Sequence, residues 1–139
     1  MPGAKEHPMI NEDHPNAKIG KDVVDHVNSG ATGDGPLWDK HWDPGFVSIE
    51  GDGMKHEGRP AVEEKHKQWF ESVKMHSCTA HGPYVTPNGF CVRYDLDCES
   101  TDGTWPRMQM DEIAVYTVEN GKVIKEEFFG RPMACPSEG

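Results

Sequence analysis

The stretch MDEIAVYTVENGKVIKEEFF, residues 110–129, decides the fold. Apolar and polar residues alternate on both sides of Asn120-Gly121, and this pattern predicts a β-hairpin with one buried face. That face also carries two acids, Glu112 and Glu126. A carboxylate on an apolar face costs free energy unless it is paired, protonated or hydrated. The two acids therefore indicate a functional site, a pair with a buried cation, or the hydrated rim of a pocket.

Two registers fit this hairpin. A three-residue turn over residues 119–121, with glycine as a bulge, pairs Glu112 with Phe128. The two acids, Glu112 and Glu126, then lie diagonally on one face, about 7–8 Å apart between their Cα atoms. A two-residue Asn-Gly turn shifts the register by one and sends Glu126 to the other face. We favour the bulged turn because it keeps Ile124 and Phe128 with the other apolar residues.

The rest of the chain predicts an α+β fold. Helices are expected where apolar residues recur at helical spacing, in residues 17–30, 35–45 and 58–74. A short strand and turn are expected over residues 46–53. The period then changes to two, which predicts strands over residues 76–85, 89–100, 108–118 and 122–129. In this order, three N-terminal helices wrap one face of a curved, mixed or antiparallel sheet.

Length and composition indicate the number of domains, the excluded partners and the expected compartment. A chain of 139 residues predicts one domain, and we place it at residues 17–130, between a flexible N-terminal arm (1–16) and a C-terminal tail (131–139). The net charge of −10 argues against a nucleic-acid partner and an anionic membrane surface. There is no long apolar run or secretory signal, and the four cysteines form no CxxC pair. We therefore expect a cytoplasmic protein with reduced thiols.

Three segments, taken in chain order, resemble segments of a known superfamily. They are FVSIEGDGMKHEGRPAVEEKHKQWF (46–70), HSCTAHGPYV (76–85) and the hairpin at residues 110–129. Over residues 17–130 the chain resembles the SnoaL-like, nuclear transport factor 2-like superfamily, which includes ketosteroid isomerases and polyketide cyclases. The resemblance implies a cone-shaped, cystatin-like fold, a deep pocket against the concave side of the sheet, acid–base chemistry without a cofactor, and a homodimer.

One position departs from this resemblance. SnoaL-type cyclases carry a base on the last strand, after an aromatic residue, and the matching position here is Phe128. Proton chemistry of that kind therefore needs another carboxylate in this chain. Two neighbouring carboxyls in a half-dry pocket repel, so that one keeps its proton near neutral pH. Glu112 and Glu126 are the acids that we expect to act as such a pair.

Three further residues are candidates for catalysis. His66 lies inside an apolar helical stripe, where it either orients a carboxylate or is a satisfied core residue. His76 opens a predicted strand, at the pocket mouth or as an end cap. Tyr94 faces inward, and its hydroxyl is either an oxyanion donor or part of the core.

The ligand is expected to be small and apolar or aromatic, because large apolar side chains would form the pocket wall. They are Trp38, Trp42, Trp69, Met108, Met110, Tyr116 and Phe128. No HExxH motif or similar spacing predicts a metal. Two functions remain open: an acid–base isomerase, cyclase or dehydratase acting on a carbonyl or aromatic compound, and a binding module without chemistry. A carboxyl titrating near neutral pH favours the first.

Overall fold

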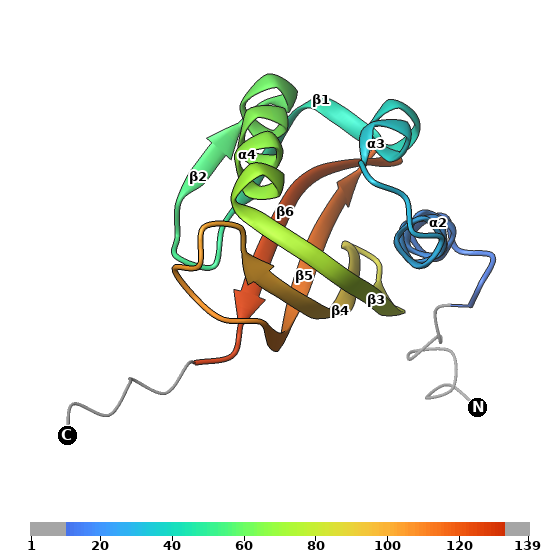
Figure 1. Cartoon of the computed structure of the whole chain (residues 1–139). Helices are drawn as coiled ribbons and strands as arrows, with labels where there is room; N and C mark the ends of the chain where they lie inside the picture. Colours follow the sequence, from blue (N-terminus) through green and yellow to red (C-terminus); the bar gives the residue numbers. More distant parts are fainter. Residues whose placement is uncertain (1–10, 133–139) are drawn as a thin grey trace.

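The computed structural model describes residues 11–132, and its elements carry the labels of Figure 1. In chain order they are α2 (Pro15–Asn28), α3 (Gly35–His41), β1 (Trp42–Ile49), β2 (Lys55–Glu57), α4 (Arg59–Ser72), β3 (Val73–Thr86), β4 (Gly89–Ser100), β5 (Met108–Glu119) and β6 (Lys122–Gly130). The predicted α+β class is confirmed. Most of the predicted N-terminal arm and C-terminal tail, including Cys135, falls outside the described residues.

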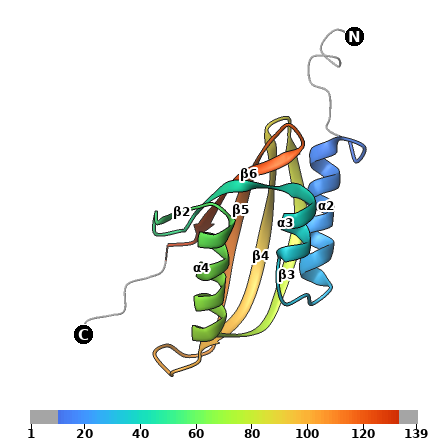
Figure 2. The same ribbon diagram turned by 90° about the horizontal axis from the view of Figure 1, so that it is seen from above.

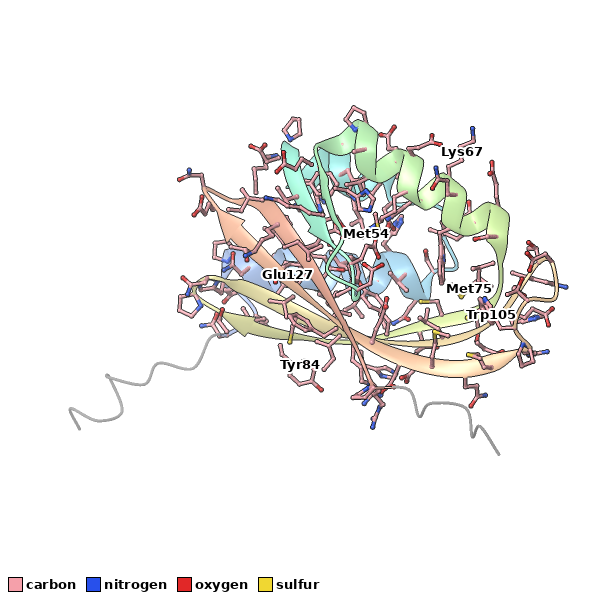
Figure 3. All side chains as sticks on the ribbon, turned by 90° about the vertical axis from the view of Figure 1, so that its left-hand side faces the viewer. Met54, Lys67, Met75, Tyr84, Trp105 and Glu127 are labelled. Carbon is pink, nitrogen blue, oxygen red and sulfur yellow. The ribbon has the colours of Figure 1, made fainter. Side chains whose placement is uncertain are left out.

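The six strands form one curved sheet in the order β2-β1-β6-β5-β4-β3. The sheet is mixed, because β1 and β6 run parallel while the other neighbours are antiparallel. All three helices lie on the same side of the sheet (Figures 2 and 3), which confirms the predicted wrapping of one face. Within residues 11–132, no helix has both the length and the apolar character needed to cross a bilayer.

Helix α2 packs closely, whereas α4 is held mainly at its start. Proline occupies the first turn of α2, and the His14 ring accepts a hydrogen bond from the Asn16 N–H at 3.0 Å. Ile19 and Val23 then bury the inner stripe of this helix. Within α4, by contrast, only Val62 is buried. The C-terminal half of α4 therefore stands over the sheet without being part of the core.

The boundaries of two predicted helices are corrected by the structure. The second predicted helix ends at His41, and Trp42 already begins β1, four residues before the predicted strand. The third ends at Ser72, so Val73 belongs to β3. In both places the chain passes directly from helix to strand, because each helix ends against an extended residue without a loop. The three-residue strand β2 was missed.

The predicted hairpin register is wrong. Glu112, Tyr116, Glu126 and Phe128 do line the cavity on the predicted inner face, but Val123 rather than Ile124 is the buried residue at the start of β6. Asn120 and Gly121 form a two-residue turn with positive φ at both positions, and Glu119 pairs with Lys122. A bulge then follows between Val118–Val123 and Thr117–Lys125. The extra residue, Ile124, restores the alternation that a simple two-residue turn would have lost. Glu126 therefore lies opposite Tyr116 on the inner face.

The core lies between α2, α3 and the centre of the sheet. Its fully buried members include Phe46, Val92 and Val123. The start of β4 approaches β5 very closely, because a Cβ atom at Gly89 would overlap the backbone oxygen of Tyr116. On the opposite face of the sheet, acidic and basic side chains form ion pairs, such as Arg107–Asp97 and Arg131–Asp111.

Candidate functional site

A cavity of about 1070 Å³ lies between the helices and the concave face of the sheet. Its walls come from α2, α3 and the loop before it, α4 and strands β1 to β6. Eleven of the twelve residues predicted for the site line this cavity: His66, His76, Tyr94, Glu112, Glu126, Trp38, Trp42, Trp69, Met110, Tyr116 and Phe128. Met108 lies further along β5, opposite Cys98 and outside the cavity wall.

Glu126 is a buried carboxyl at the inner end of the cavity, with only 4% of the residue exposed. The Trp42 indole N–H donates to its Oε1 at 3.1 Å, and the Ser48 hydroxyl donates to its Oε2 at 3.4 Å. Burial raises the pKa of Glu126 to about 7, against the lowering effect of Lys65 and of these donors. This carboxyl therefore exchanges a proton near neutral pH.

Glu112 is a second acid on the cavity wall, on β5 opposite Tyr94. Burial is the main cause that raises its pKa, followed by the charge of Glu50, while Lys65 lowers it. No side chain in residues 11–132 donates a hydrogen bond to its carboxyl or forms an ion pair with it. Glu112 therefore presents a partly dehydrated carboxylate to whatever occupies the cavity.

The two acids do not form the predicted pair. Glu126 lies opposite Tyr116 and Glu112 lies opposite Gly130, so four residues separate them along the strands. At about 3.3 Å per residue, this separation is about 13 Å. The correction follows from the bulge in β6, which places Glu126 nearer the turn than the predicted register did. The acids share one cavity, and each titrates in its own surroundings.

Tyr94 and Tyr116 form a hydroxyl pair beside Glu126. Their oxygens are 2.6 Å apart, and both side chains are buried. Burial is the main cause that raises the pKa of both phenols, so both stay protonated. A hydrogen bond between two hydroxyls uses only one of their two hydrogens. One O–H therefore remains available to a ligand oxygen.

His66 faces an acid that the sequence analysis missed. Its Nδ1 lies 3.8 Å from Oδ2 of Asp34, while His26 Nε2 lies 3.6 Å from Oδ1 of the same carboxylate. The His66 ring packs against Trp38, with the ring centroids 5.1 Å apart. Burial lowers the pKa of His66, and the charge of Asp34 opposes that effect. Asp34 thus joins α2, the start of α3 and α4 at the cavity wall.

The rim of the cavity is more exposed. His76 lies at a bulge in β3, between Met75 and Ser77, and its Nε2 is 3.3 Å from Glu99 Oε1. Trp69, on the open half of α4, is 39% exposed. Met75 lies between α4 and the sheet at the same end (Figure 3). These residues surround the entrance rather than the inner end.

Four polar residues of the cavity region were missed by the sequence analysis: Asp34, Ser48, Glu50 and Lys65. They come from separate elements, and no spacing along the chain connects them. Asp34 stands just before the Gly-Pro start of α3, a position typical of a helix N-cap. Lys65 differs from Lys67, on the same helix, by lining the cavity. Within residues 11–132, no group of three His, Cys, Asp or Glu side chains is arranged to hold a metal.

Comparison with solved structures confirms the fold. A candidate SnoaL-like polyketide cyclase from Mesorhizobium loti is 30% identical, with a TM-score of 0.72, and the match covers 81% of this chain and 97% of that one. A nuclear transport factor 2-like protein of unknown function from Burkholderia pseudomallei K96243 matches 85% of this chain and 92% of its own. At 13% identity and a TM-score of 0.69, it is similar in fold alone.

A third structure has the same fold. It is a hypothetical protein with a ketosteroid isomerase-like fold from Catenulispora acidiphila, in complex with trimethylamine, at 6% identity and a TM-score of 0.63. That match covers 77% of this chain and 82% of the other. No protein of curated function matches the chain. The sequence profile of the SnoaL-like domain matches residues 40–130, which is most of the chain. The chain therefore belongs to the SnoaL-like family.

Proposed function

We propose that this protein catalyses proton transfer next to a carbonyl group of a small apolar or aromatic compound, in an isomerisation, cyclisation or dehydration. One observation supports the proposal: a single cavity holds Glu112, which has no ion-pair partner among residues 11–132, and Glu126, whose pKa is raised to about 7 by burial. A pocket that only holds an apolar ligand has no need of two dehydrated acids.

Glu112 is the proposed base. General acid–base catalysis requires a group within hydrogen-bond reach of the proton that it removes. The carboxyl of Glu112 faces the cavity and is not held by a protein donor in the described chain. Its raised pKa increases its proton affinity over that of an ordinary glutamate. It takes the place of the last-strand base, since Phe128 occupies the matching position.

The acid side of the reaction is assigned to Tyr94, Tyr116 and Glu126. Removing a proton next to a carbonyl moves negative charge onto the carbonyl oxygen, and donors placed there lower the barrier. The free O–H of the tyrosine pair is one donor. The protonated form of Glu126 is a second donor, since its pKa is about 7. His66 then orients Asp34, and His76 acts at the rim on polar groups of the substrate.

The walls favour a flat, apolar substrate. Trp38, Trp42 and Phe128 contribute aromatic surface inside, and Trp69 contributes it at the entrance. The polyketide cyclase name of the Mesorhizobium loti relative agrees with a substrate that carries both rings and carbonyls. Such aromatic walls bind planar compounds while the few polar groups fix their orientation.

Deuterium exchange tests the proposal without a known substrate. Aryl ketones and 1,3-dicarbonyl compounds are incubated with the protein in D2O, and loss of the α-proton signal is followed by NMR. We expect the wild-type protein to accelerate exchange for at least one compound. Glu112→Gln should remove most of the acceleration, because the amide cannot accept the proton. Glu127→Gln, which changes an acid on β6 that pairs with Lys125 and does not line the cavity, should retain it.

The alternative function, binding without chemistry, predicts a different result. A pocket of that kind binds phenols or ketones, seen as quenching of tryptophan fluorescence, but gives no exchange in any variant. That outcome would reject the catalytic proposal and retain the binding module. Exchange that Glu112→Gln leaves unchanged would reject Glu112 as the base. Exchange lost equally in Glu127→Gln would reject the assignment of a specific acid.

The outer face of the sheet is the proposed surface of a homodimer in the cytoplasm. Ile113 pairs with Phe129 across β5 and β6, and they are 45% and 53% exposed. Tyr84, on the same side of the sheet (Figure 3), is 63% exposed. Apolar side chains grouped in this way favour burial in an interface. Sedimentation analysis should find a dimer, and Ile113→Asp should convert it to a folded monomer.

A further inference from the structure

Lys65 is the one lysine or arginine among the cavity-lining residues of the described chain. It projects from α4, and its side chain is 15% exposed. Its ammonium donates to the Ser48 hydroxyl oxygen at 2.9 Å and lies 2.7 Å from Oε1 of Glu50. It also lies over the Phe128 ring, 5.1 Å from the centroid. Contacts on three sides thus hold this charge in one place.

Ser48 connects this charge to Glu126. The two residues are direct partners in the parallel pairing of β1 with β6, and Ser48 is completely buried. A hydroxyl has a single hydrogen. Because Ser48 accepts from Lys65, its own hydrogen is directed to Glu126 Oε2, 3.4 Å away. The Trp42 N–H holds the other carboxyl oxygen at 3.1 Å.

We propose that Lys65 is a positioning residue, which acts through Ser48 to fix the orientation of the Glu126 carboxyl and to keep that carboxyl able to release its proton at neutral pH. The proposal rests on the proposed function for its purpose, since a carboxyl that never releases its proton can donate a hydrogen bond but cannot transfer a proton to the substrate. The geometry itself holds whether or not the cavity is catalytic.

Among the charges around Glu126, Lys65 has the largest lowering effect on the pKa of that carboxyl. The other titratable groups that line the cavity are His26 on α2, Asp34 before α3, Glu50 and Asp52 after β1, His56 on β2, His66 on α4, His76 and Cys78 on β3, Tyr94 on β4, and Glu112 and Tyr116 on β5. Burial raises the pKa of Glu126, and Asp34 raises it further. Lys65 is the charge that lowers it, and the donors Trp42 and Ser48 assist. Removing the ammonium leaves the two hydrogen bonds to oppose the effect of burial.

The test is an NMR titration of the ligand-free protein with ¹³C-labelled glutamate side chains, in which Glu126→Gln assigns the Glu126 signal. In Lys65→Met we expect the midpoint of Glu126 to move upward by about one pH unit or more. The matched control is Lys67→Met, with the same charge change on the same helix. Lys67 is exposed and points away from the sheet (Figure 3), so its removal should leave the midpoint in place.

Two further variants separate positioning from general stability. Lys65→Arg keeps the positive charge and should restore a midpoint near that of the wild type. Ser48→Ala keeps Lys65 but removes the bridge, and it should raise the midpoint by less than Lys65→Met does. If Lys65→Met does not fold, the midpoint of Glu126 in Ser48→Ala still tests whether the bridge through Ser48 affects that carboxyl. An unchanged midpoint in Ser48→Ala, or in folded Lys65→Met, would overturn the proposal, as would an equal shift in Lys67→Met.

The result does not depend on finding a substrate. If no ketone exchanges deuterium, the titration can still show the link from Lys65 to Glu126, and the proposed function alone fails. If exchange is observed but the titration midpoint of Glu126 is the same in Lys65→Met as in the wild type, the proposed function stands and the positioning role is rejected.

Discussion

The hydroxyl oxygens of Tyr94 and Tyr116 lie 2.6 Å apart on adjacent strands, and the two residues are 7% and 5% exposed. Neither phenol reaches bulk water, so each depends on the other for its hydrogen bond. An unpaired buried hydroxyl costs about 1–3 kcal/mol, whereas removal of both partners is nearly neutral. This relationship leads to the first prediction.

Tyr94→Phe and Tyr116→Phe should each lower the free energy of unfolding by about 1–3 kcal/mol. The double variant should be closer to the wild type than the sum of the single changes, because it leaves no hydroxyl alone. Urea denaturation of the four proteins measures this coupling. Additive losses would show that each hydroxyl has another partner, such as a buried water.

Glu126 should make the protein less stable as the pH rises. Its pKa rises from 4.5, the ordinary value of a glutamate, to about 7 in the fold, so between these values the folded state holds a proton that the unfolded state has released. The free energy of unfolding therefore falls through this window, by about 3 kcal/mol in total, and then levels off. Glu112 contributes in the same direction, since its pKa is also raised.

Glu126→Gln should remove most of this slope and should stabilise the protein at pH 8. Chemical denaturation at half-unit steps from pH 4.5 to 8 measures the slope. The matched control is Glu127→Gln, the next residue on β6, which pairs with Lys125 instead of lining the cavity. A slope that is the same in Glu126→Gln as in Glu127→Gln would mean that Glu126 is ionised throughout.

Asp34→Asn should lower the pKa of His66 further. Burial already lowers that pKa, and the Asp34 carboxylate is the main opposing charge. Histidine ring signals followed by NMR against pH give the midpoint directly. Asp25→Asn is the control, because Asp25 is an exposed acid on α2 that pairs with Lys21. If the midpoint of His66 is identical in Asp34→Asn and the wild type, the two groups do not interact in solution.

Gly89→Ala should be strongly destabilising. The added Cβ would overlap the Tyr116 carbonyl oxygen, so β4 must move away from β5. Overpacking of this kind costs about 1–3 kcal/mol or more. Gly130→Ala makes the same change where a Cβ meets no atom within 4 Å, and its melting temperature should stay near that of the wild type. Equal melting temperatures for both variants would show that the strands separate easily.

The sequence was sufficient to predict the layers of the fold and the inner face of the hairpin. Alternation assigned Glu112 and Tyr94 to the inner face of the sheet, because the side-chain period of a strand is two. The face of Glu126 depended on the choice between two hairpin registers. The spacing between the acids could not be predicted, since it depends on a bulge at Ile124 that no turn signal marks. The polar partners of Glu126 could not be predicted from the sequence either. Lys65 and Ser48 meet only after α4 folds over β1, and nothing local distinguishes this lysine from Lys67.

Helix α4 buries one residue, Val62, near its start, while Trp69 and Phe70 near its end are 39% and 49% exposed. The end of α4 that lines the entrance is therefore separate from the start of α4, which is packed into the core. Replacing Trp69 or Phe70 changes the shape of the opening and removes little buried area. Related chains can thus differ in sequence at this end of the helix and bind different compounds. The acids inside the cavity and the fold around them need not change.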